Sequence, residues 1–195
     1  MLDSILNKIV KILFFIIILF SFSCEDAEYE LDNIFDPDNM GLDAPALFFH
    51  PNDINVELGD TIEIDLYSYK MGPASAAYLK IKYTQGIRLL NVQSDDFFQG
   101  DNQPLIHWDL PEEQESYLNI QIYYLPDMNS IQAEGGTWSL AKIQFIAEIN
   151  RKVYLDYIIA ADSSEGENGP YTELRNFNNQ PLIINDYGDA EINIE

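Results

Sequence analysis

The chain has 195 residues, of which 47% are hydrophobic and 13% are aromatic, and its formal net charge is −23 at pH 7. This length suits one domain with a full hydrophobic core. The charge argues against a nucleic-acid partner, whose phosphates would be repelled, and against direct adsorption to an anionic lipid surface.

The first 23 residues have the layout of a bacterial export signal. Lys8 and Lys11 supply positive charge, a continuous apolar run covers residues 12–20, and the small residue Ser23 precedes Cys24. The apolar run is too short for a transmembrane helix, which needs about 20 residues. Cys24 is the sole cysteine and lies just beyond the end of the run, so we expect cleavage before it and a lipid on its sulfur. Secretion with a free thiol is the alternative.

Residues 24–45 are rich in Asp and Glu and show little apolar periodicity. Such a composition predicts an extended, solvated tether. The tether is expected to contribute no apolar surface, so a domain that begins near Ala44 should fold by itself. With the lipid anchor, this organisation predicts attachment to the outer membrane or the cell surface, the leaflet being left open.

From residue 46 onward, apolar and polar residues alternate with a period of two. Alternation of this kind is typical of strands buried on one face only, and Gly- and Pro-containing turns separate the segments. The sequence therefore predicts an all-β domain over residues 46–195, an antiparallel β-sandwich of about nine strands. The nine expected strands are residues 46–50, 54–58, 61–67, 78–84, 117–125, 141–149, 152–160, 181–185 and 191–194.

The order of these segments resembles the cohesin family, whose jelly-roll sandwich is shared with family 2 and 3 carbohydrate-binding modules. The resemblance rests on VELGDTIEIDLYSYK, AAYLKIKYTQGIRLLNV, GGTWSLAKIQFIAEI and the closing pair TELRNFNNQPLIIN and GDAEINI. It implies a non-catalytic binding module. Cohesins that hold a dockerin present Asn and Asp on the outer face of the third strand, where this chain has Ala76 and Tyr78. The resemblance therefore supports the fold more strongly than dockerin as the partner.

A binding face is predicted on two of the expected strands, which in cohesins belong to the sheet that docks the partner. Alternation places Tyr78 and Lys80 outward on one strand, and Tyr123 and Leu125 outward on the other. Exposed tyrosines with flanking amides and lysines suit a protein or glycan surface. The alternative interpretation is a solvated sheet face with incidental tyrosines. The expected partner is another exported protein, dockerin-like or otherwise, or a polysaccharide; a structural subunit of an envelope complex is the second hypothesis.

Catalytic and metal-binding patterns are scarce. His50 and His107 are the only neutral bases, and both are interpreted as structural residues beside a proline and a tryptophan. No nucleophile elbow, zinc motif or phosphate loop occurs, so neither an enzyme nor a cofactor is expected. FDPDNMG lacks the ligand pattern of a calcium loop, and Asp162–Glu167 is interpreted as a solvated acidic loop, with calcium binding as the alternative.

Overall fold

The computed structural model describes residues 40–98, 102–111, 117–125, 135–160 and 171–195. These residues form twelve strands, and no helix among them is long and apolar enough to span a membrane. The strands are β1 (Ala46–His50), β2 (Asp53–Val56), β3 (Thr61–Tyr69), β4 (Ala76–Tyr83), β5 (Ile87–Ser94), β6 (Leu105–Asp109), β7 (Tyr117–Tyr123), β8 (Thr137–Ala147), β9 (Lys152–Tyr157), β10 (Glu173–Arg175), β11 (Asp186–Gly188) and β12 (Ala190–Ile194).

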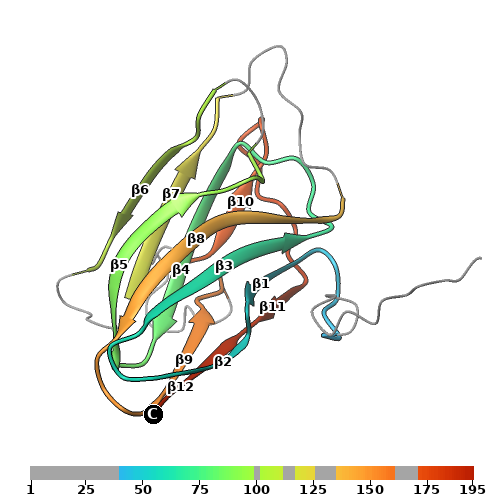
Figure 1. Ribbon diagram of the computed structural model, residues 1–195. Coiled ribbons are helices and arrows are strands. Elements are labelled where there is room, and N and C mark those ends of the chain that lie inside the picture. Colours follow the sequence, from blue (N-terminus) through green and yellow to red (C-terminus); the bar gives the residue numbers. More distant parts are fainter. Residues whose placement is uncertain (1–39, 99–101, 112–116, 126–134, 161–170) are drawn as a thin grey trace, which may run out of the picture. The chain divides into compact units, whose positions relative to one another are not determined.

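The strands form two sheets that pack face to face (Figure 1). The five-stranded sheet has the order β11-β1-β3-β8-β5, and the seven-stranded sheet has the order β2-β12-β9-β4-β7-β6 with β10 paired to β4. A single apolar core lies between the sheets. Stacked rings of Phe49 and Tyr157, with centroids 4.5 Å apart, join the two layers. The predicted β-sandwich is confirmed, and its arrangement fits a jelly roll.

One-sided burial follows the sequence alternation. On β3, Ile62, Ile64 and Leu66 are buried, whereas Glu63 is exposed. On β4 and β7, Ile81 and Ile120 are fully buried. Successive side chains of a strand point to opposite faces, so the apolar set of each strand enters the core and the polar set faces solvent.

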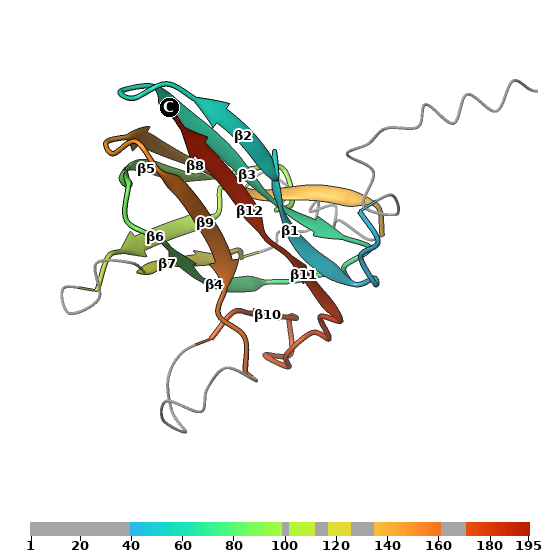
Figure 2. The same cartoon turned by 90° about the horizontal axis from the view of Figure 1, so that it is seen from below.

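Two strand pairs are parallel rather than antiparallel, and each joins a strand from the start of the domain to one from its end. β1 pairs with β11 in the five-stranded sheet, and β2 pairs with β12 in the seven-stranded sheet. Each chain segment passes from one sheet to the other, β1 into β2 at Pro51 and β11 into β12 at Asp189 (Figure 2). Pro51 cannot donate a backbone hydrogen bond, which suits a position where the ladder changes sheets. The sandwich is therefore mixed, not purely antiparallel.

Eight of the nine expected segments contain a strand, and the prediction for residues 181–185 is wrong. That segment makes only an isolated bridge, between Pro181 and Arg175, and Ile183 is 75% exposed. Four strands had not been counted, β5, β6, β10 and β11. The pairing of β5 is interrupted by a register shift between Leu89 and Asn91, which breaks its alternation. β10 and β11 have three residues each, too few for a periodic signal.

The last residues of the predicted tether are part of the folded domain. Met40, Leu42 and Ala44 pack against a second apolar cluster, formed by Ala46, Phe48 and Tyr69 on the outer side of the five-stranded sheet. Hydrogen bonds reinforce the packing, since the Asn185 side chain donates to the Ala44 carbonyl at 2.6 Å and the Asn185 backbone N–H donates to the Pro45 carbonyl at 2.7 Å. We call residues 40–45 the strap. The expectation that the tether contributes no apolar surface is wrong for this segment.

Candidate binding face

Strand register brings three strands of the seven-stranded sheet into one continuous outer face. Ala76 on β4 is opposite Tyr123 on β7, which in turn is opposite Leu105 on β6. Residues directly opposite each other in neighbouring strands point to the same side of the sheet. The next two rows are Tyr78, Gln121 and His107, followed by Lys80, Asn119 and Asp109. With Lys82 and Tyr117, which are opposite each other in a fourth row, these residues make up the binding face.

One end of the binding face is apolar and open to solvent. Leu105 is 67% exposed, Tyr123 is 51% exposed, and Leu125, which follows Tyr124 beyond the end of β7, is 72% exposed. Neighbouring exposed apolar side chains on a soluble domain mark an interaction site more often than isolated ones do. Leu105 was missed in the sequence, although the alternation in LIHWD places it on the same face as His107 and Asp109.

Tyr78 lies beside this apolar end and is half-buried. Loss of hydration, the charge of Asp109 and the proximity of Tyr123 together raise the pKa of the Tyr78 phenol to about 12. The phenol therefore stays neutral over the physiological pH range and can both donate and accept a hydrogen bond.

The middle of the binding face carries a hydrogen-bonded amide–carboxylate pair. The Asn119 Nδ2 donates to Asp109 Oδ2 at 3.0 Å, and Asn119 is only 9% exposed. Its Oδ1 has no hydrogen-bond partner within the described part of the chain. The resemblance implies an Asn and an Asp on β4, where Ala76 and Tyr78 stand. Here the two residue types come from β7 and β6 and share the same face.

Two lysines lie at the other end of the binding face. The Lys80 ammonium lies 5.2 Å from the centroid of the Tyr117 ring, and Lys82 is exposed. β4, β6 and β7 carry Lys80, Lys82 and Asp109 on this face, and Asp156 of β9 lies directly opposite Lys82. The charges at this end are therefore of both signs, an arrangement that sets orientation and specificity more than affinity.

The structure brings together the residues predicted for the site. Tyr78, Lys80 and Tyr123 share the binding face, and Leu125 extends its apolar end. His107, interpreted from sequence as structural, is instead exposed on this face. His50 ends β1, with its ring edge-on to Tyr67 at a centroid distance of 6.0 Å.

Metal-binding groups are not assembled within the described residues, where no three His, Cys, Asp or Glu side chains cluster. Asp36 and Asp38 of FDPDNMG, and the acidic loop Asp162–Glu167, lie outside the described residues, as does Cys24.

Comparison with known proteins gives a fold but no sequence family. No protein-family model matches the chain, and no curated protein matches it. Similar solved structures include a non-cellulosomal cohesin from the archaeon Archaeoglobus fulgidus, with a TM-score of 0.54 and 10% identity over 77% of this chain and 90% of that one. A type II cohesin domain from the cellulosome of Acetivibrio cellulolyticus has a TM-score of 0.57 and 13% identity over 76% of this chain and 94% of that one. The fold of the domain is cohesin-like.

A third similar structure is a type I cohesin–dockerin complex from Clostridium thermocellum, with a TM-score of 0.53 and 14% identity over 79% of this chain and 97% of the matched chain. At identities this low, the structural similarity establishes the fold alone. It confirms the architecture that the order of sequence segments implied.

Proposed function

We propose that the protein is a non-catalytic docking module. Its binding face would hold another exported protein of the dockerin type, while a lipid on Cys24 anchors it at the outer membrane or cell surface. The cohesin-like fold supports this proposal, because some similar structures are of cohesin–dockerin complexes. The position of Cys24 just beyond the end of the apolar run supports the anchor.

The observation that carries the proposal is the pairing of Leu105 with Tyr123 beside the Asn119–Asp109 hydrogen bond. Protein interfaces commonly combine a few exposed apolar anchors with polar groups that set orientation. A sheet held by cross-strand hydrogen bonds keeps both sets of side chains at fixed positions, so little conformational entropy has to be lost on binding.

A double variant tests the binding face, Leu105→Ala with Tyr123→Ala. Both side chains are more than half exposed, so the melting temperature should change little. Partner binding should fall by about tenfold or more, because interface anchors often contribute about 2 kcal/mol. Leu90→Ala is the matched control, since Leu90 is an exposed leucine on β5 of the other sheet.

The assay captures ligands on the immobilised protein from three sources, namely purified type I and type II dockerins, culture fluid and insoluble polysaccharides. Protein capture that the double variant loses and the control keeps supports the proposal. Equal capture by wild type and double variant contradicts the assignment of the face. Retention of polysaccharide alone would favour a glycan-binding module, and permanent co-purification with envelope proteins would favour an assembly subunit.

The anchor has its own test, which is independent of the binding face. Cys24→Ala should abolish labelling by a fatty-acid analogue and move the protein from the detergent phase to the soluble fraction. Unchanged labelling and partitioning of this variant would rule out a lipid on Cys24.

A further inference from the structure

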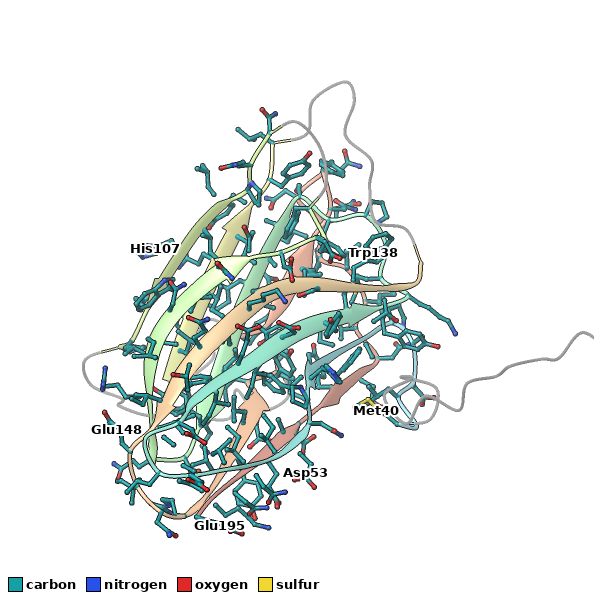
Figure 3. All side chains as sticks on the ribbon, viewed as in Figure 1. Met40, Asp53, His107, Trp138, Glu148 and Glu195 are labelled. Carbon is teal, nitrogen blue, oxygen red and sulfur yellow. The ribbon has the colours of Figure 1, made fainter. Side chains whose placement is uncertain are left out.

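A pocket lies where the strap meets the corner at which β11 passes into β12. It has a volume of about 390 Å³. We call it the corner pocket; its lining residues are Met40, Leu42, Asn52, Tyr154, Tyr187, Gly188, Asp189, Ala190 and Glu191. Met40 and His107 lie on opposite sides of the domain (Figure 3), so the corner pocket is separate from the apolar end of the binding face.

The lining of the corner pocket combines apolar, aromatic and acidic groups. Met40 and Leu42 supply the apolar side chains of the strap, and Tyr154 supplies a ring that is 44% exposed. Asp189 and Glu191 add two carboxylates, and none of the lining residues is basic. A small cavity with an apolar wall and a few convergent polar groups is the usual form of a ligand site. The carboxylates select against an anionic ligand.

The ammonium group of Lys152 already interacts with two residues that line the corner pocket. Lys152 forms an ion pair with Glu191, and its Nζ lies 6.0 Å from the centroid of the Tyr154 ring. A hydrogen bond to Glu191 raises the pKa of Lys152, so its ammonium stays charged. Glu191 and Tyr154 are thus oriented to hold a cation, while Asp189 forms no ion pair with any described residue.

We propose that the corner pocket binds an alkylammonium or alkylguanidinium group. The alkyl stem would lie against Met40 and Leu42, and the cation would lie between Asp189 and the Tyr154 ring. Long basic side chains bind in this way, with the stem on apolar surface and the charge at polar groups. The ligand is either a free small amine or a Lys or Arg side chain of a peptide. This inference does not depend on the proposed docking function.

Calorimetric titration of the purified full-length chain tests the ligand class. The probes are cadaverine, agmatine and N-acetyl-lysine methylamide, with N-acetyl-norleucine methylamide as the uncharged control. We expect the cations to bind, with shifts of the Gly188 and Ala190 amide resonances, and the norleucine derivative not to bind. Stronger binding of the free diamines identifies a free amine, and stronger binding of the lysine derivative identifies a peptide. Equal binding of the norleucine derivative, or no binding of any cation, overturns the proposal.

Variants test the geometry of the corner pocket. Asp189→Asn should weaken cation binding about two- to fivefold, the range of an exposed ion pair. Tyr154→Leu should weaken it by a similar factor, about two- to fivefold, through loss of the cation–π contact. Lys152→Met should instead strengthen binding, because it removes the internal competitor for Glu191 and Tyr154.

Glu63→Gln is the matched control for the loss of one negative charge, since Glu63 lies on β3, does not line the corner pocket and accepts a hydrogen bond from Gln144. It should leave the affinity unchanged. An equal loss of affinity in Glu63→Gln and Asp189→Asn would indicate unspecific attraction to an acidic protein and overturn the site. Weaker binding in Lys152→Met would also overturn it.

Discussion

Gly188 lies opposite Phe48 in the parallel ladder of β1 and β11. A Cβ atom at position 188 would be 3.0 Å from the Phe48 Cβ and 3.5 Å from the Leu42 Cδ1. The absent side chain is therefore what lets Leu42 of the strap pack beside Phe48. The requirement is for space, because tight cores accept added atoms only with displacement of their neighbours.

Gly188→Val should lower the free energy of unfolding by about 1–3 kcal/mol, the usual cost of overpacking. The Phe48 Cβ belongs to a paired strand and cannot yield, so the strap should be displaced instead. Chemical denaturation measures the first effect, and hydrogen exchange of the Asp43 amide, which donates to Asp186 at 3.3 Å, reports the second. Gly72→Ala is the control, because its nearest contact would be 3.9 Å away. An equal loss of stability in the control would contradict this account.

Removal of the strap should show whether this segment stabilises the folded domain or belongs to the tether. A chain that begins at residue 46 lacks Met40 and Leu42 and exposes Phe48 and Tyr69, which are 2% and 4% exposed in the intact domain. At about 25 cal/mol per Å² of apolar surface, the loss should be about 1–3 kcal/mol relative to a chain that begins at residue 39. Thermal melting of the two chains is the measurement. Identical melting temperatures would mean that the strap adds nothing to stability.

Inward-facing isoleucines of the binding strands should respond differently from the outward residues. Ile81 on β4 and Ile120 on β7 are fully buried, so replacement of either by Ala leaves a cavity. We expect a loss of about 2–5 kcal/mol in the free energy of unfolding for each. Denaturant titration measures it, with Leu105→Ala as the exposed comparison. A loss below that of Leu105→Ala would place these side chains outside the core.

Tyr78 should make stability depend on pH in the alkaline range. Its pKa in the folded protein is about 12, against an ordinary value of 10.0. Below the ordinary value the phenol is protonated in both states, so its contribution is fully present there. As the pH rises toward the folded pKa, the unfolded phenol ionises first and stability is lost.

Ring carbon NMR of labelled tyrosine follows this titration. Tyr78→Phe should remove the phenolic signal with a pKa near 12. Asp109→Asn should lower the pKa of Tyr78 only in part, because loss of hydration is the larger cause and the aspartate charge the second. If the pKa of Tyr78 is unchanged in Asp109→Asn, the charge of Asp109 does not contribute to the raised pKa of Tyr78.

Local sequence pattern was sufficient for the core and for the direction of the side chains on β4. Alternation identified Leu79 and Ile81 as inward and Tyr78 and Lys80 as outward, because side-chain direction in a strand depends only on parity. The same rule would have placed Leu105 on the binding face, but β6 had not been counted as a strand.

The sequence by itself determined that the domain is a one-sided β-sandwich, since strand periodicity is a local property of the chain. Only the tertiary structure decided which strands are neighbours, and hence that Asn119 of β7 meets Asp109 of β6. The packing of the strap could likewise not be predicted from local pattern. Leu42 packs beside Phe48 and Gly188, and Gly188 is remote from Leu42 in the sequence. Strand order and chain crossings depend on the free energy of the whole core, so no segment encodes them alone.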